Sequence, residues 1–375
     1  FISLAALLSG VLNATGRFAA AAAAPVLLNV ILVSAMAAAH WLGGDVARAL
    51  IWAIPAAGVA QLLLVGWAAR RAGFTMAWQR PRLSPELRRL VKIAIPAALA
   101  GGVVQVNLLV GQQVASYFDR AVGWLYAADR LYQLPLGVVG IAIGIVLLPD
   151  LSRRLKAGDD AGGRHALSRA GEISLALTVP CAVALVAVPL PIVSVLFERG
   201  ATRPEDSAAI ALAVAIYGLG LPAFVLQKVL QPLYFAREDT RTPFRYAVWA
   251  MVVNAVVAIG LAPLVGWIAS AVATTAAAWV MVGLLFAGTR PMGDVARFDA
   301  RFATRLGRIL LASGVMGAAL LAADHALGAA LYLPGWRYLA LAALVAGGAL
   351  VYLAAAHVTG AMRLSEMRAA LRRGG

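Results

Sequence analysis

The stretch AVGWLYAADRLYQLPLGVVGIAIGIVLLP, residues 121–149, decides the fold. A bilayer core is crossed by about 20 mostly apolar residues, and this stretch is long enough. It nevertheless carries Asp129 beside Arg130. A charged residue at the bilayer centre costs roughly 2.5–3.5 kcal/mol on insertion scales, so such residues usually face a bundle interior or a wet cavity. The stretch therefore predicts a membrane-spanning helix whose charged residues face a bundle interior or a wet cavity.

The composition of the whole chain agrees with a membrane protein. Of the 375 residues, 62% are hydrophobic and 13% are charged, against about 45–50% and 25% in soluble domains. The mean hydropathy is +0.84. The net charge of +15 comes from residues in short segments between apolar runs, not from a basic face interleaved with aromatic rings. This pattern argues against nucleic acid as a partner.

Apolar runs separated by breaks predict an all-α, polytopic bundle of about eleven spans. The first run is already under way at Phe1, without a methionine or a basic leader, which predicts a chain lacking its natural N-terminus. Pro135 predicts a bent fifth span, and Pro180 with Pro189 a bent sixth. The spans are expected at residues 1–15, 22–41, 50–69, 91–115, 121–149, 171–197, 207–233, 243–262, 264–287, 306–323 and 336–357.

Basic and non-basic connections alternate along these spans. The basic segments are 70–92, 153–169, 290–308 and 363–373, and the segments between them are short or balanced in charge. By the positive-inside rule, the basic segments and the C-terminus are expected in the cytoplasm and Phe1 on the outside. Prolines 81 and 85 break the first basic segment, which predicts an amphipathic cytoplasmic linker at 70–90.

The charged pair in the fifth span has two readings. In one, Arg130 faces a wet cavity and holds an anionic group such as phosphate, because its planar fork suits bidentate contacts. In the other, the pair ties two helices together. Adjacent helix positions diverge by about 100°, so Asp129 and Arg130 are not expected to face the same way.

The fourth span carries a stripe of amides. Gln105 and Gln112 are seven residues apart and share a helix face, which either lines the same cavity or bonds across helices. No Cys or His pair has the spacing of a metal site, and Cys181 is interpreted as a small buried hydrophobe. We expect no metal.

The chain lacks the residue patterns of an enzyme. Its seventeen acids show no paired carboxylates, serine–base arrangement or phosphate-cradling loop. Because no nucleotide-binding module is present either, we expect a carrier without a cofactor, driven by an ion gradient or the membrane potential.

Several motifs together resemble one known family. They are ADRLYQLPLG at 128–137 continuing to LLPDLSR at 147–153, LFERGA at 196–201, YFAREDTRTP at 234–243, and the segments Leu12–Ala14 and Ala24–Asn29. The chain resembles the MurJ/MviN family of lipid II flippases over essentially its whole length.

The resemblance implies a two-lobed fold of the multidrug/oligosaccharidyl-lipid/polysaccharide exporter superfamily, here without its first three helices. Residues 1–69 would complete the N-terminal lobe, 70–90 the linker, and 91–287 the six-helix C-terminal lobe. Residues 288–357 would supply a basic loop and two extra helices forming a groove for the lipid tail, and 358–375 a cytoplasmic tail. The implied substrate is lipid II, the undecaprenyl-pyrophosphate-linked peptidoglycan precursor, moved from the inner to the outer leaflet of the bacterial inner membrane by alternating access.

The same resemblance implies roles for individual residues. Asp129 and Arg130 match a cavity-lining pair, and Gln133 stands where the family often has an acid. Asn254 and Thr274 match two sodium ligands of some members, but the acidic ligand positions match Gly111 and Ala258, so no sodium site is predicted. The implied partners are membrane lipids and cell-wall synthesis proteins, with a monomer as the working unit.

Two other functions remain open on the residues alone. One is a multidrug or other polysaccharide-precursor exporter of the same superfamily, although a cationic cavity favours an anionic substrate. The other is a non-transporting scaffold for cell-wall enzymes.

Overall fold

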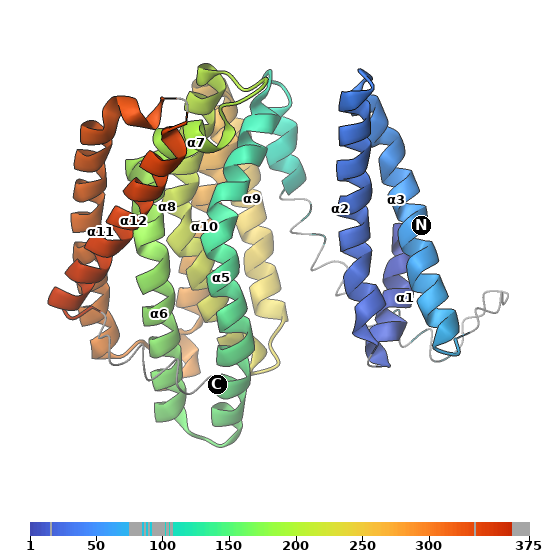
Figure 1. The fold of residues 1–375 in the computed structure, drawn as a ribbon. Helices are drawn as coiled ribbons and strands as arrows, with labels where there is room; N and C mark the ends of the chain where they lie inside the picture. Colours follow the sequence, from blue (N-terminus) through green and yellow to red (C-terminus); the bar gives the residue numbers. More distant parts are fainter. Residues whose placement is uncertain are drawn as a thin grey trace. The chain divides into compact units, whose positions relative to one another are not determined.

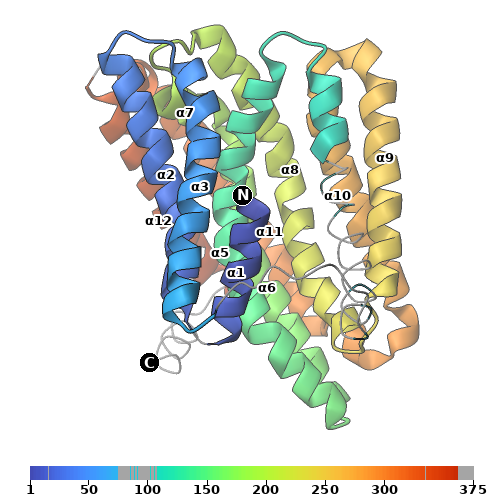
Figure 2. The same cartoon turned by 90° about the vertical axis from the view of Figure 1, so that its right-hand side faces the viewer.

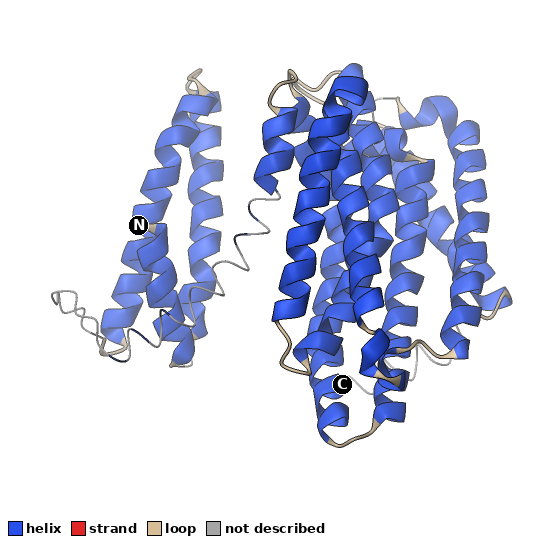
Figure 3. Cartoon of the chain, turned by 180° about the vertical axis from the view of Figure 1, so that it is seen from behind, coloured by secondary structure: helices blue, strands red, loops and turns tan. Residues whose placement is uncertain are grey.

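The computed structural model describes residues 1–74 except 16, residues 108–361 except 334, and the single residues 85, 88, 91, 102 and 105. Every regular element in these ranges is helical, as Figure 3 shows. The predicted all-α class is therefore confirmed. The chain divides into two compact units, Phe1–Arg88 and Arg89–Gly375, and each contains an apolar core of its own.

The first unit is a bundle of three helices, α1 (Ile2–Ala14), α2 (Phe18–Trp41) and α3 (Val46–Arg71). A short turn joins α2 and α3 into a long hairpin (Figure 2). Asp45 starts α3 by accepting hydrogen bonds from the backbone of the next turn, as expected of a helix N-cap. The Gln61 amide of α3 donates to the Ala24 carbonyl of α2 at 2.9 Å. This buried hydrogen bond joins the two mostly apolar helices.

The second unit contains the remaining long helices, together with a helical segment at 108–115. They are α5 (Ala121–Lys156), α6 (Asp160–Ala187), α7 (Pro189–Phe197), α8 (Pro204–Phe235), α9 (Arg241–Val265), α10 (Ala269–Gly288), α11 (Ala300–Leu327) and α12 (Arg337–Val358). Single 3-10 turns at Gly266–Ile268, Arg290–Met292, Asp294–Ala296 and Gly328–Leu331 connect some of them.

Seven helical segments of the described ranges are long and apolar enough to cross a membrane by length and composition. They are Phe18–Trp41, Val46–Arg71, Asp160–Ala187, Pro204–Phe235, Arg241–Met292, Asp294–Leu327 and Arg337–Val358, of which Arg241–Met292 contains both α9 and α10. The helix α5 covers the whole predicted run 121–149. Most of the predicted span 91–115, the linker 70–90 beyond residue 74 and the tail beyond 361 lie outside the described residues.

Two predicted boundaries were wrong. The predicted sixth span is two helices, because α6 ends at Ala187 and Pro189 opens α7; a proline at the first helical position fits a helix start. The basic segments 153–169 and 290–308 are not mainly loops, since α5 runs to Lys156, α6 starts at Asp160 and α11 starts at Ala300. Helical hydrogen bonding continues past the apolar run, so hydropathy marks the membrane core and not the helix end.

The helices α11 and α12 pack beside α6, at one flank of the second unit (Figure 1). A shared apolar cluster joins the three helices, and the hydroxyl of Tyr352 on α12 donates to the Ala176 carbonyl of α6 at 2.5 Å. Small residues allow the close approach: a Cβ on Gly171 would lie 2.8 Å from the ring of Phe302. The terminal helix pair is therefore bonded into the second unit through α6.

The connections of the second unit gather at two ends with different charge. Residues 150–172, 236–246 and 289–308 form one end, with thirteen Lys or Arg and eight Asp or Glu. Residues 116–120, 188–206, 265–268 and 324–337 form the other, with four basic and five acidic residues. We call these the basic end and the balanced end.

Candidate substrate-binding site

The buried side of α5 fixes how this helix is rotated in the second unit. Ala128 and Leu131 are buried against the core. Tyr132 is buried beside them, and its ring stacks on Phe224 of α8 at 5.2 Å and lies 5.0 Å from Tyr217 of the same helix. Aromatic pairs at these centroid distances add to the packing energy beyond their buried area. The opposite side of α5 is thereby turned away from the core.

That opposite side carries polar residues at helical spacing. Tyr126, Arg130 and Gln133 are all exposed within the described structure, and positions i, i+4 and i+7 share one face. The Arg130 guanidinium lies over the Tyr126 ring, 4.5 Å from its centroid, and donates a hydrogen bond to the Tyr126 hydroxyl. We call Tyr126, Asp129, Arg130 and Gln133 the polar face of α5.

Asp129 lies at the edge of this face. It is half-buried, and its carboxylate accepts a hydrogen bond from the Gln133 amide one turn further along. The hydrogen bonds of both charged residues to described side chains therefore stay within α5. An arginine held over a ring and beside a hydroxyl presents a planar set of donors, which suits a phosphate or carboxylate and supplies no group for covalent chemistry.

The amides of the fourth predicted span are only partly described. Gln105 and Gln112 are both helical and exposed. Their neighbour Gln113 lines an apolar pocket of roughly 530 Å³ between the segment 108–115 and α9, together with residues such as Tyr117 and Ile259. Gln112 does not line this pocket. The described contacts do not join Gln105 or Gln112 to the polar face of α5.

Asn254 and Thr274, the two residues matched to ion ligands, are brought together by a hydrogen bond. The Asn254 amide donates to the Thr274 hydroxyl at 3.4 Å, and this hydroxyl donates to the Ser270 carbonyl at 2.9 Å. The Ser270 hydroxyl in turn donates to the Gly111 carbonyl at 3.0 Å. Ala258 stands fully buried nearby. Gly111 and Ala258 carry no carboxylates, and the buried Oδ1 of Asn254 has no hydrogen-bond partner among the described residues.

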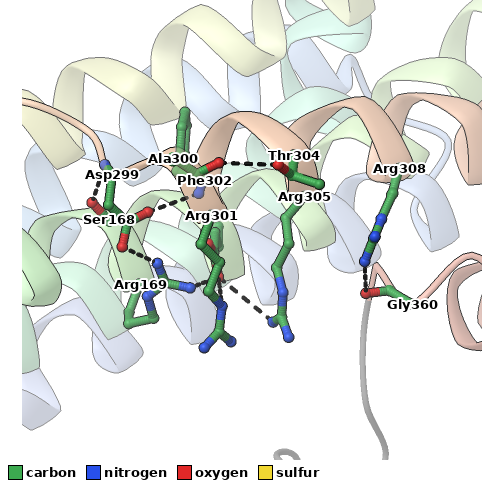
Figure 4. Close-up of polar contacts among 11 residues, drawn as sticks. Ser168, Arg169, Asp299, Ala300, Arg301, Phe302, Thr304, Arg305, Arg308 and Gly360 are labelled. Carbon is green, nitrogen blue, oxygen red and sulfur yellow. Dashed lines mark hydrogen bonds and ion pairs between the residues drawn. The ribbon is translucent and has the colours of Figure 1, made fainter.

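A second polar cluster was not foreseen from the sequence. Arg169 and Glu172 of α6 meet Asp299, Arg301 and Arg305 at the start of α11, and we call these five residues the α6–α11 ionic network (Figure 4). Arg169 donates to both Glu172 and Asp299. One oxygen of Glu172 also lies 3.6 Å from a nitrogen of Arg305 and 3.8 Å from one of Arg301.

The surroundings of this network are well defined. The Glu172 side chain is only 5% exposed. Asp299 caps α11 by accepting from the Phe302 backbone at 2.7 Å, and its own backbone amide donates to the Ser168 hydroxyl at 3.0 Å. The sequence contains one signal for this network, the i, i+4 spacing of Arg301 and Arg305. It does not reveal their partner Glu172, which lies 129 and 133 positions earlier in the chain.

Several helices are long and apolar enough to cross a membrane, and α5 beside them carries a polar, cationic face. Together they define a multi-pass helical membrane protein of the carrier type. Comparison with known proteins identifies the family. The family described as lipid II flippase MurJ matches residues 1–347.

Two relatives named "Probable lipid II flippase MurJ" are similar over all or most of this chain. The one from Rhizobium meliloti (strain 1021) is 43% identical over 100% of this chain and 71% of its own length. The one from Rhizobium tropici is 42% identical over 86% of this chain and 61% of its own length. A solved structure entitled "Lipid II flippase MurJ, inward closed conformation" has the same fold, with a TM-score of 0.76 and 22% identity over 95% of this chain and 70% of that one. This chain belongs to the MurJ family.

Proposed function

We propose that this chain moves lipid II across the inner membrane, and that the polar face of α5 contacts the pyrophosphate of the headgroup. The observation that carries the proposal is Arg130, an exposed cation on a helix whose following residues 134–149 are all apolar. The match of residues 1–347 to the lipid II flippase MurJ family supports lipid II as the substrate. The chain spans 71% and 61% of the lengths of the two Rhizobium relatives.

The charge of the two ends supports an orientation. Lys and Arg are enriched in cytoplasmic connections of inner-membrane proteins. The basic end of the second unit, with thirteen basic residues against four at the balanced end, would therefore face the cytoplasm, and the C-terminus with it. A reporter fused after α12 tests this, because a periplasmic alkaline phosphatase signal would contradict the orientation.

We also propose that the membrane potential or an ion gradient drives transport, and that the protein works as a monomer, with cell-wall synthesis proteins as neighbours. Arg130 suits this scheme because its charge stays fixed while the anionic headgroup crosses.

Growth rescue tests the function. Bacteria depleted of their own lipid II flippase would receive the natural gene product that contains residues 1–375, either intact, as Arg130→Ala or as Arg153→Ala, at matched membrane levels. Arg153 is the control because it lies on the same helix, 76% exposed, and pairs with Asp150 at the basic end. We expect rescue by the intact protein and by Arg153→Ala, and loss of rescue with Arg130→Ala.

The other outcomes separate the alternatives. Equal rescue by all three forms would remove Arg130 from the substrate site and leave it as a structural partner. Failure of the intact form, with the protein present in the membrane, would favour an exporter of another polysaccharide precursor or of drugs.

A further inference from the structure

One end of the first unit carries a pocket that the proposed transport site on α5 does not use. The pocket has a volume of roughly 810 Å³ and lies between the end of α1, the start of α2 and the end of α3. Figure 2 shows these three helix ends at the same end of the unit. Its apolar part is formed by the buried Leu12 and the half-buried Ala20, Leu64 and Ala68. A pocket of this size and lining is within the range of small-molecule sites and accommodates part of a hydrocarbon chain.

Two arginines and two exposed rings complete the lining. Arg17, before α2, and Arg71, in the last turn of α3, line the pocket together with Phe18 and Trp67. Trp67 is 59% exposed, and the Arg71 guanidinium lies 5.3 Å from the centroid of its ring. No described residue accepts a hydrogen bond from the guanidinium of Arg17 or of Arg71. The pocket therefore presents two cations whose N–H donors have no acceptor in the described part of the chain.

The residues around the pocket add no negative charge. Segments 12–23 and 64–74 contain three arginines and no acidic residue, whereas the opposite end of the unit, residues 40–48, has one arginine and one aspartate. By the positive-inside rule the pocket end of the unit faces the cytoplasm, and Trp67 then stands at the headgroup level, where tryptophan is enriched. The cytoplasmic leaflet carries anionic lipids that are attracted to arginines at this level.

We propose that this pocket binds an anionic phospholipid of the cytoplasmic leaflet, with Arg17 and Arg71 on its phosphate and the apolar residues against an acyl chain. Arginine suits a phosphate because it can bond two oxygens at once. From Arg17 to Ala23, which also lines the pocket, the chain rises about 9 Å, so the pocket extends from the headgroups into the hydrocarbon. A soluble anion would use the arginines and not the apolar lining, which favours a lipid. The proposal concerns the first unit alone and does not depend on the substrate carried by α5.

Lipid binding to the purified natural gene product that contains residues 1–375 tests the site in detergent. The probe is phosphatidylglycerol, with phosphatidylcholine as the zwitterionic reference, and the readout is the rise in melting temperature as lipid is titrated. The variant is Arg17→Gln with Arg71→Gln. We expect its apparent affinity for phosphatidylglycerol to fall about fivefold for each arginine, or about 25-fold in all. Without lipid it should melt like the intact protein; a large loss of stability there would mean that the arginines bond within the protein, and would overturn the site.

A matched control removes the same two charges outside the pocket. Arg70 is exposed and precedes Arg71 on α3 but does not line the pocket, and Arg48 is exposed near the opposite end of the same helix. We expect Arg48→Gln with Arg70→Gln to bind phosphatidylglycerol like the intact protein. An equal loss in the two double variants would reduce the effect to overall charge and overturn the site, as would unchanged binding by Arg17→Gln with Arg71→Gln.

Two further probes test the nature of the ligand. Glycerol phosphate presents the phosphate without acyl chains, and an equal rise in melting temperature with it would overturn the lipid assignment. A rise with undecaprenyl pyrophosphate and none with phosphatidylglycerol would overturn the phospholipid and assign the pocket to a prenyl lipid. Normal growth rescue by an intact protein that does not bind phosphatidylglycerol would reject only this proposal, whereas binding without rescue would reject only the flippase function.

Discussion

Arg130 and Arg305 are two arginines in the same unit with opposite surroundings. Arg130 is exposed, and its hydrogen bond goes to Tyr126 on its own helix. The Arg305 side chain is 12% exposed and lies 3.6 Å from a carboxylate oxygen of Glu172, on a different helix. The polar face of α5 therefore presents its charge outward, while the α6–α11 ionic network places its charges between helices.

The difference separates two uses of charge in an apolar protein. Removing one partner from a buried ion pair leaves the other charge uncompensated, at a cost of several kcal/mol. An exposed charge that contacts only its own helix contributes little to stability. The presence of Arg130 on an apolar helix therefore needs another explanation, and contact with the substrate is the one we propose. Stability and transport should respond to the two clusters in opposite ways.

The largest effect is expected in the network. Glu172→Gln removes the negative charge that three arginines share, and we expect it to lower the free energy of unfolding by about 3–5 kcal/mol, as for other broken buried pairs. The melting temperature of the purified protein measures this. Asp294→Asn is the control, since Asp294 is 72% exposed in its pair with Arg297 and should change stability by less than about 0.5 kcal/mol. Similar melting temperatures for the two variants would show that the network does not tie α11 to α6.

A smaller effect is expected from packing around the same two regions. A Cβ at Gly171 would meet the rings of Phe302 and Phe298 at 2.8 and 3.0 Å, so Gly171→Ala should cost about 1–3 kcal/mol. Gly137 on α5 has no atom within 4 Å of the same position, so Gly137→Ala should be neutral or stabilising by up to about 1 kcal/mol. Chemical unfolding of both variants measures the difference in the free energy of unfolding. An equal loss for the two variants would contradict the prediction, because it would mean that a side chain at position 137 is not accommodated freely.

Much of the fold could be predicted because one signal dominates a membrane protein. Apolar runs located the helices α2, α3, α8, α9 and α12 to within a few residues, since backbone groups in a bilayer must bond within their own helix. The same signal failed at the ends of α5 and α6. Residues such as Arg153 and Arg164 are polar but helical, and hydropathy cannot distinguish a helix in water from a loop.

The candidate site was predictable only in part. Asp129 and Arg130 were found because charges in an apolar run are costly. The contact of Arg130 with Tyr126 follows from i, i+4 spacing and could have been proposed. The contact of Glu172 with Arg305 could not, because it joins residues 133 positions apart through the packing of two helices. Which face of α5 is buried depended likewise on Tyr217 and Phe224, far along the chain.

Arg130 itself should contribute little to stability. Arg130→Ala loses a ring contact and one hydrogen bond at an exposed position, so we expect a stability change of about 0.5–1 kcal/mol at most. Together with failed growth rescue, an almost unchanged melting temperature would assign Arg130 to transport. A loss of stability as large as that of Glu172→Gln would instead mean that Arg130 holds two helices together. The two clusters would then not differ in their roles.

The smallest effect is expected at Asp239, in the turn between α8 and α9, where the carboxylate accepts hydrogen bonds from the nearby Thr242. Hydrogen bonds from Thr242, including one from its backbone amide at 3.0 Å, hold the pKa of the Asp239 carboxyl below its ordinary value. A depressed folded-state pKa means that the stabilisation is complete above the unfolded pKa of about 3.9 and is lost as the pH falls through the folded value. Asp239→Asn keeps the acceptor oxygen but loses the charge near the start of α9, so at pH 7 it should cost only about 0.3–1 kcal/mol. Melting temperatures of the intact protein and the variant, measured from pH 7 down to about pH 3, should converge as Asp239 is protonated; a difference that stays constant with pH would show that the carboxylate charge contributes nothing to this turn.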